Sequence, residues 1–170
     1  MKFNTAEATA SAVLFYFSIT CDIIPFMEYN ILLVDDDRLD LDCLIKLIPW
    51  KELGLRVSGA MNSSLDALDV AENCSIDILI TDIQMPVPSG LDLCEKILEM
   101  QPGVYPVFIS GHEEFSYARK AIEMGAAGYL LKPLNVDELI NLLKDLTKAI
   151  TKARNENSDG TAQYAARALA

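Results

Sequence analysis

Residues 30–37 read NILLVDDD, a mostly apolar run of five residues followed by three consecutive aspartates. A short, uninterrupted apolar run is typical of a β-strand covered on both faces, because a half-exposed strand alternates apolar and polar residues. Further strand-like runs follow along the chain, and stretches with the apolar spacing of helices separate them. These runs are LRVSGA (55–60), DILIT (77–81), YPVFIS (105–110) and AGYLL (127–131).

Five strand-helix units in this order predict the α/β class. We expect a doubly wound (βα)5 fold, which is an open parallel sheet with helices on both faces, joined by right-handed crossovers. In such sheets, ligands bind beyond the carboxyl ends of the strands, where the strand order reverses. The search for chemistry therefore narrows to the residues that end each strand.

Polar side chains occupy these strand ends, and we expect them to meet at one edge of the sheet. They are Asp35, Asp36 and Asp37 after the first run, Thr81 and Asp82 after the third, Ser110 and Gly111 after the fourth, and Lys132 and Pro133 after the fifth. Carboxylates this close repel by roughly 4 kcal/mol per pair at an effective dielectric of about 20, so a cation is needed among them. Oxygen ligands without His or Cys favour Mg²⁺. A metal ion and an ammonium beside one carboxylate prepare it to attack phosphorus.

Four motifs at these strand ends together resemble the CheY-like receiver domains of two-component response regulators. They are ILLVDDD (31–37), DILITDIQMPVPSG (77–90), VFISGHEEFSYARKA (107–121) and GYLLKP (128–133). The resemblance covers about residues 29–150 and is closest to receivers fused to AraC-type helix-turn-helix output modules. It implies a flavodoxin-like strand order of 2-1-3-4-5.

The resemblance also implies a role for each matching residue. Asp82 corresponds to the phosphoacceptor, and Asp36 and Asp35 to the acid pair that holds Mg²⁺, Asp36 directly and Asp35 through water. The backbone carbonyl of Gln84 corresponds to a main-chain metal ligand. Lys132 corresponds to the lysine that pairs with the phosphoryl oxygens, and its bond to Pro133 is expected to be cis.

Two further matches concern the switch that the family carries. Ser110 corresponds to the hydroxyl that turns toward the phosphoryl group, and Gly111 leaves room for that group to enter. Tyr129 corresponds to the aromatic switch residue on the fifth strand. Its ring is expected to move inward when Ser110 shifts, which would alter the face made by the fourth helix, the fifth strand and the fifth helix.

Several of these residues also have purely structural interpretations. Asp37 is expected to be the N-cap of a helix starting at Arg38 or a solvated neighbour, since Asp is favoured at that position. Tyr129 can equally be an ordinary half-buried tyrosine. His112 lies where family members vary in dephosphorylation rate, but an exposed loop histidine is the expected interpretation.

Other functions fit the sequence less well. In a phosphohydrolase of the haloacid dehalogenase type, Asp35 would be the nucleophile and Asp37 the general acid. Leu39 stands where that family usually has Thr or Val, and no second acidic pair follows a later strand. A flavodoxin-like flavin binder would need a glycine-rich phosphate loop where this chain has DDDRLD. A receiver that never takes phosphate is disfavoured because the key positions are intact.

The charge excludes one class of ligand. The chain has 170 residues, with 25 acidic and 14 basic, and a net charge of −11. The stretch 27–150 alone holds 21 acidic and 10 basic residues. We therefore expect no direct binding to nucleic acid. The cysteines at positions 21, 43, 74 and 94 form no CxxC pair, so we interpret them as reduced thiols in a cytoplasmic protein.

The ends of the chain differ from its middle. Residues 1–26 contain the apolar stretch AVLFYFSI (12–19), too short for a membrane span, and are interpreted as a misplaced start before Met27 or a weak signal-like segment. Residues 27–150 are the expected receiver domain. Residues 151–170 predict a linker stub or a disordered tail, with no second domain.

Taken together, these residues predict a phosphorylation-controlled signalling switch, and not an enzyme beyond its own phosphorylation and dephosphorylation. A partner histidine kinase or a small phosphodonor would transfer a phosphoryl group to Asp82 in a Mg²⁺ site. Phosphorylation would then change the affinity for a partner, or for a second copy in a homodimer, through the switch face. No membrane association is expected.

Overall fold

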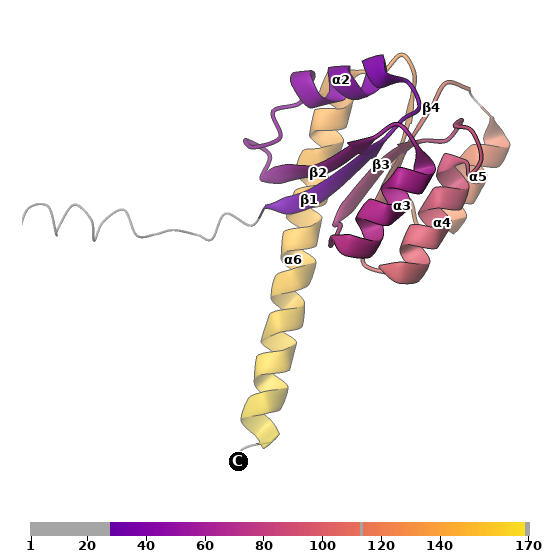
Figure 1. Ribbon diagram of the computed structural model, residues 1–170. Coiled ribbons are helices and arrows are strands. Elements are labelled where there is room, and N and C mark those ends of the chain that lie inside the picture. The colour runs from indigo at the N-terminus through magenta and orange to yellow at the C-terminus, as the bar shows by residue number, and fades with distance from the viewer. Residues whose placement is uncertain (1–27, 113, 169–170) are drawn as a thin grey trace, which may run out of the picture.

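The structure, a computed structural model, describes residues 28–112 and 114–168. Five parallel strands form one sheet in the order β2-β1-β3-β4-β5 (Figure 1). They are β1 (Tyr29–Val34), β2 (Leu55–Met61), β3 (Ile78–Asp82), β4 (Tyr105–Ser110) and β5 (Gly128–Leu131). The predicted doubly wound α/β fold and its strand order are confirmed, and each strand lies within one residue of its predicted bounds.

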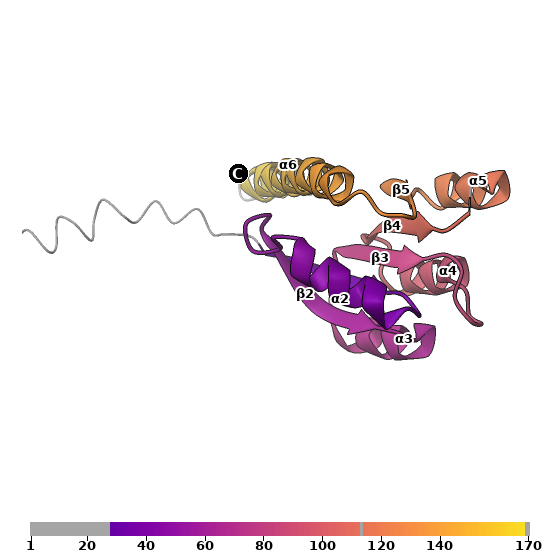
Figure 2. The same cartoon turned by 90° about the horizontal axis from the view of Figure 1, so that it is seen from above.

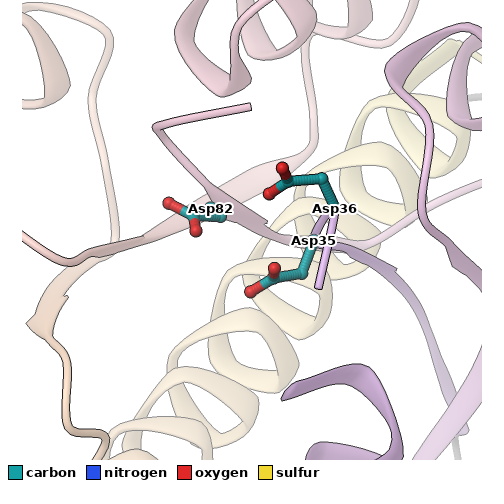
Figure 3. Close-up of side chains that lie close together, drawn as sticks. All are labelled: Asp35, Asp36 and Asp82. Carbon is teal, nitrogen blue, oxygen red and sulfur yellow. The ribbon is translucent and has the colours of Figure 1, made fainter. Parts of the chain in front are cut away.

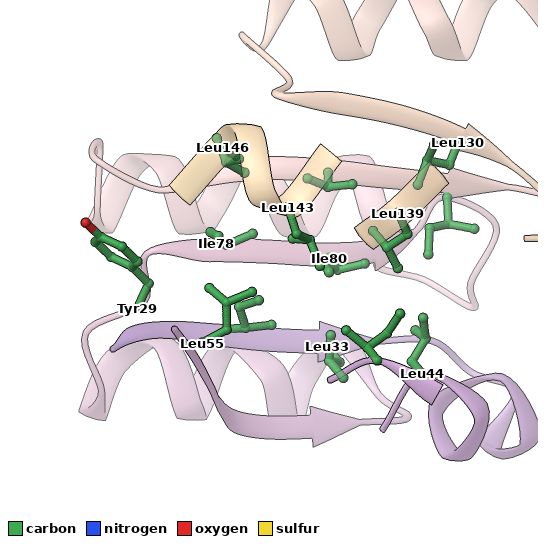
Figure 4. Packing of buried hydrophobic residues seen from close by; sticks show 14 of the residues in the cluster. Tyr29, Leu33, Leu44, Leu55, Ile78, Ile80, Leu130, Leu139, Leu143 and Leu146 are labelled. Carbon is green, nitrogen blue, oxygen red and sulfur yellow. The ribbon is translucent and has the colours of Figure 1, made fainter. Parts of the chain in front are cut away.

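Helices cover both faces of the sheet (Figures 1 and 2). One face carries α2 (Arg38–Leu47) and α6 (Val136–Ala168), and the other carries α3 (Ser64–Asn73), α4 (Gly90–Met100) and α5 (Phe115–Glu123). On the α2 and α6 side, Leu44 and Leu143 share a buried cluster with Leu33 of β1 and Ile80 of β3 (Figure 4). The central strands are therefore buried on both sides, which explains their uninterrupted apolar runs.

Side chains at the carboxyl edge of the sheet start the next helices. Asp37 is the N-cap of α2, and its Oδ1 accepts a hydrogen bond of 2.8 Å from the Leu39 N–H. The interpretation of Asp37 as a cap is thus confirmed. Ser89 and Asp92 form a reciprocal capping box at the start of α4. These caps fix the helix starts beside the strand ends that precede them.

Gly90, the first residue of α4, packs directly on the backbone of β3. A Cβ atom at this position would lie 1.8 Å from the carbonyl oxygen of Asp82 and 2.9 Å from Oγ1 of Thr81. The Gly90 N–H donates a hydrogen bond of 3.1 Å to the carbonyl of Ile83. The end of β3 and the start of α4 are therefore in contact at a distance that only glycine permits.

For residues 151–170, the alternative of a disordered tail is wrong over the described residues, because α6 continues to Ala168. The alternative of a linker stub stays a prediction. The stretch contains no proline, and alanine, arginine and glutamate are strong helix formers, so the single Gly160 does not interrupt the helix. Figure 1 shows that α6 runs well beyond the end of the sheet opposite the strand carboxyl ends.

Contacts fasten this part of α6 to the amino-terminal edge of the sheet. The hydroxyls of Tyr29 and Thr151 are 2.7 Å apart and form a hydrogen bond. The guanidinium of Arg154 lies 4.9 Å from the centre of the Tyr29 ring and forms an ion pair with Asp77. Packing of the domain therefore continues past the predicted boundary at Ile150.

Some predictions concern residues 1–26, including Cys21, and these lie outside the described residues. Within the described residues, Cys43, Cys74 and Cys94 are free thiols. Burial raises the pKa of the Cys94 thiol to about 12. Across residues 28–112 and 114–168, no helix combines the length and the apolar character that crossing a membrane requires.

Candidate functional site

The predicted site residues meet at the carboxyl edge of the sheet. Asp35 directly follows β1, and Asp82 and Ser110 are the last residues of β3 and β4. Lys132 directly follows β5. Because β1, β3, β4 and β5 are successive neighbours in the sheet, residues up to 97 positions apart in sequence lie in one place.

Three carboxylates form the centre of the site. One oxygen atom from each of Asp35, Asp36 and Asp82 lies within 4.8 Å of the other two (Figure 3). Asp35 and Asp82 are buried, whereas Asp36 is exposed to solvent. Three hard oxygen ligands at this spacing, with one side open to water, suit a divalent cation that keeps part of its hydration shell. The expectation that these three side chains converge is confirmed.

Backbone N–H groups hold the two buried carboxylates in place. The N–H of Gln84 donates to Oδ1 of Asp82 at 2.9 Å, and the N–H of Asp37 donates to Oδ1 of Asp35 at 2.9 Å. Gln84 therefore lies beside the cluster, as expected, and its N–H orients Asp82. The predicted metal-ligand role of its carbonyl stays a prediction.

The ammonium of Lys132 binds three carboxylates at once. Its Nζ lies 2.8 Å from Oδ2 of Asp35, 2.7 Å from Oδ2 of Asp82 and 2.7 Å from Oδ2 of Asp40. Burial alone would lower the pKa of Lys132, but the hydrogen bonds to the three carboxylates outweigh it and raise the pKa above its ordinary value. Lys132 is therefore a permanent positive charge facing Asp82.

Burial has the opposite consequence for Asp35. It raises the pKa of this carboxyl above its ordinary value of 3.8, although the hydrogen bonds from Lys132 and from the Asp37 N–H lower it in part. The ionised form of Asp35 is thus less favourable in the folded protein than in the unfolded chain. The folded protein thus bears a free-energy cost at neutral pH for keeping Asp35 ionised. Together with Asp36 and Asp82, Asp35 offers carboxylate oxygens to a cation.

Asp35→Asn is expected to raise the free energy of unfolding of the metal-free protein at pH 7, because the variant removes a buried carboxylate whose pKa burial raises. The folded pKa of Asp35 lies above the unfolded value, so the wild type loses stability as pH rises through that range. The advantage of the variant should disappear near pH 3, where Asp35 is protonated in both states. Urea denaturation in EDTA across this pH range measures it. A variant that is less stable than the wild type at pH 7 would contradict the prediction.

The hydroxyl of Ser110 is bonded to its own loop. Ser110 Oγ donates to the backbone carbonyl of His112 at 3.0 Å and accepts from the His112 N–H at 3.2 Å. The Tyr129 hydroxyl lies 3.5 Å from the same carbonyl. The Tyr129 ring packs against the buried cluster on the face of the sheet that carries α3, α4 and α5. His112 is exposed, as expected. Its backbone, and not its imidazole, thus links the two predicted switch residues.

Sequence reasoning missed Asp40. This residue lies in the first turn of α2, which the Asp37 cap places directly beyond the aspartate cluster. The available signal was an acidic residue one helical turn after Asp36, on a helix that begins at the site. The predicted cis bond between Lys132 and Pro133 is confirmed, and Val87–Pro88 is a second cis bond that the sequence did not predict.

Comparison with known proteins gives a consistent result. The family model described as "Response regulator receiver domain" matches residues 31–144. The chain is 36% identical over 118 residues to an uncharacterized transcriptional regulatory protein, YesN, of Bacillus subtilis, covering 69% of this chain and 32% of that protein. It is 33% identical over 131 residues to the response regulator protein TmoT of Ectopseudomonas mendocina, covering 77% of this chain and 58% of that protein. The chain thus spans about a third to somewhat over half of these relatives.

Solved structures show the same relationship. The receiver domain of AraT, a response regulator from Geobacillus stearothermophilus, superposes with a TM-score of 0.70 at 28% identity, covering 74% of this chain and 98% of that one. A two component transcriptional regulator AraC from Clostridium phytofermentans gives a TM-score of 0.66 at 29% identity, covering 75% and 98%.

Proposed function

We propose, from the premise that the chain belongs to the response regulator receiver domain family, that Asp82 accepts a phosphoryl group from a histidine kinase. Receiver domains are signalling switches of two-component systems. The observation that carries the proposal is the placement of the Lys132 ammonium 2.7 Å from Oδ2 of Asp82, beside the carboxylates of Asp35 and Asp36.

In the proposed transfer, a carboxylate oxygen of Asp82 attacks the phosphorus atom of the donor. A bond forms between that oxygen and phosphorus, while the bond from phosphorus to the donor histidine nitrogen breaks. The leaving nitrogen keeps the electron pair and takes up a proton. Lys132 stabilises the negative charge on the transferred oxygens, and the Gln84 N–H keeps Asp82 oriented. The product is an acyl phosphate.

The donor set suits Mg²⁺, because its preferred ligands are oxygens of carboxylates, carbonyls and water. Asp35, Asp36 and Asp82 would hold it, together with the backbone carbonyl of Gln84. Bound there, the ion would neutralise charge on the phosphoryl oxygens. The burial of Asp35 and Asp82 supports this assignment, since two buried carboxylates next to an exposed third leave an excess of negative charge beyond what Lys132 balances.

The switch would start at Ser110. To reach a phosphoryl group on Asp82, its hydroxyl must leave the His112 carbonyl, which also accepts from Tyr129. The loop rearrangement would therefore alter the environment of both side chains, and bias Tyr129 toward its inward position. The shared acceptor supports a coupling between the two.

The output surface is proposed to be the face of α5, β5 and α6, which are the fourth helix, fifth strand and fifth helix of the sequence. Phe115 and Ile122 on α5 and Leu131 on β5 are large exposed apolar side chains there. They suit a second copy of the chain or another protein partner better than a polyanion. We further propose that residues 27–150 form the receiver unit together with the next turn of α6, which carries Thr151 and Arg154, that the unit acts in the cytoplasm, and that it does not itself bind nucleic acid.

The test of this function is incubation with Mg²⁺ and acetyl phosphate, followed by borohydride trapping and peptide mapping. Label at Asp82, lost in Asp82→Asn and retained in the matched charge variant Asp69→Asn, is the expected result. Label at Asp35, or repeated turnover of small phosphate esters, would instead favour the dehalogenase-type hydrolase that uses Asp35 and Asp37.

A further inference from the structure

The three hydrogen bonds of Lys132 occupy all the N–H donors of its ammonium group. An ammonium group has three N–H donors, and here each is matched by one carboxylate oxygen, from Asp35, Asp40 and Asp82. Before the transfer, while Asp82 is still a carboxylate, an incoming phosphoryl oxygen can therefore bind Lys132 well only if one of these acceptors gives way. The free-energy cost of bringing the phosphoryl group to Lys132 depends on which acceptor gives way.

Burial decides which acceptor can be released. The side chains of Asp35 and Asp82 are 3% and 8% exposed, whereas that of Asp40 is 45% exposed. A buried carboxylate that loses its cation has no water to replace it, while a half-exposed one is hydrated at once. Asp40 is therefore the acceptor that leaves Lys132 most easily.

Two features around Asp40 make this release feasible. Asp40 lines a cavity of about 270 Å³ between α2 and the loop after β5, which leaves room for its side chain to turn away from Lys132. It also lies in the first turn of α2, where the helix N-terminus stabilises a negative charge without a counterion. The charge of Asp40 is thus tolerated with or without Lys132.

We propose that Asp40 is a positioning residue, which holds one donor of Lys132 in the resting site and yields it to a phosphoryl oxygen as the phosphoryl group approaches Asp82. The inference rests on the proposed function and adds a control on it. In the resting protein, Asp40 keeps Lys132 engaged and restrains phosphorylation. When the phosphoryl group arrives, the contact between Asp40 and Lys132 is lost.

The test compares Asp40→Asn with Asp42→Asn, which removes the same charge from the same helix at an exposed residue that pairs with Lys46. Calorimetry with Mg²⁺ and beryllofluoride, a phosphoryl analogue, should give about two- to fivefold tighter binding for Asp40→Asn than for the wild type. The rate of phosphorylation by acetyl phosphate should rise by the same factor. A two- to fivefold change corresponds to a free energy of about 0.4 to 1 kcal/mol, which is the usual contribution of an ion pair that is partly exposed to solvent.

Further variants separate positioning from a loss of structure. Asp40→Glu restores a carboxylate and should return both values toward the wild type. Asp40→Ser also removes the carboxylate, and should match Asp40→Asn. A variant that merely disturbs the fold would bind beryllofluoride more weakly, not more tightly.

The outcomes distinguish this inference from the proposed function. If the wild type binds beryllofluoride but Asp40→Asn gains nothing over Asp42→Asn, or loses affinity, Asp40 does not restrain Lys132 and only this inference is overturned. If the wild type takes neither beryllofluoride nor a phosphoryl group, the proposed function fails and the inference fails with it.

Discussion

Replacing Gly90 with alanine is expected to lower the free energy of unfolding by about 3 kcal/mol or more, because overpacking against fixed backbone is relieved only by moving the backbone. The added methyl group would lie 1.8 Å from the Asp82 carbonyl oxygen and 2.8 Å from its carbonyl carbon. Asp82 belongs to a central strand that is paired on both sides, so the start of α4 has to shift instead. Urea denaturation measures the loss.

The matched control is Gly103→Ala, where an added Cβ has no atom within 4 Å. That variant should stay within about 0.5 kcal/mol of the wild type. Asp82 phosphorylation in the Gly90 variant should also fall, since α4 starts against the residue that would be phosphorylated. A Gly90→Ala protein as stable as Gly103→Ala would show that the contact between α4 and β3 is looser than the geometry indicates.

Lys132→Met is expected to have two opposite effects on the site. Phosphorylation of Asp82 by acetyl phosphate should slow by about 100-fold or more, which is the usual loss when one charge-stabilising donor is removed. Mg²⁺ should nevertheless bind more tightly, by about tenfold, because the ammonium that repels it from the same carboxylates is gone. Rates of trapped label and calorimetric titration measure the two effects in one protein.

Removing Lys132 also leaves Asp35 and Asp82 buried without their cation, so the rate of trapped label is measured in Mg²⁺, and the Mg²⁺ titration starts from metal-free protein whose fold has first been checked. Lys46→Met, at a lysine on the exposed side of α2, removes the same charge and should change neither value appreciably. Unchanged phosphorylation in Lys132→Met would rule out contact between Lys132 and the transferred group. Weaker Mg²⁺ binding would mean that the lysine assembles the cluster instead of competing for it.

The sequence predicted the site well where a strand end determined the position. The positions of Asp35, Asp82 and Lys132 follow directly from the strand order, since each side chain stands at the end of a predicted strand. The position of Asp36 follows from that of Asp35, because the two residues are adjacent in the sequence. Their convergence needs no knowledge of helix packing, only the rule that carboxyl ends of parallel strands share an edge.

Features that depend on how a helix sits on the sheet were not predictable in this way. Asp40 reaches Lys132 only because α2, capped by Asp37, begins at Arg38 with one particular orientation. Gly90 matters because α4 approaches the backbone of Asp82, whereas a glycine before an apolar helix is equally compatible with an ordinary turn. The extension of α6 was missed because its polar composition is also typical of a linker, while Arg154 in fact pairs with Asp77 across 77 residues.

The geometry of α6 has a consequence for how motion can pass through the molecule. With 33 residues, α6 is about 50 Å long. It starts four residues after Lys132, and Arg154 attaches it to the amino-terminal edge of the sheet through the ion pair with Asp77. The remaining turns to Ala168 extend about 20 Å past that attachment. If the first turn of α6 tilts by about 10° about a pivot at Arg154, the other end of the helix, at Ala168, moves by about 4 Å in the opposite direction. A displacement beside Asp82 would thus be inverted at the far end of the domain.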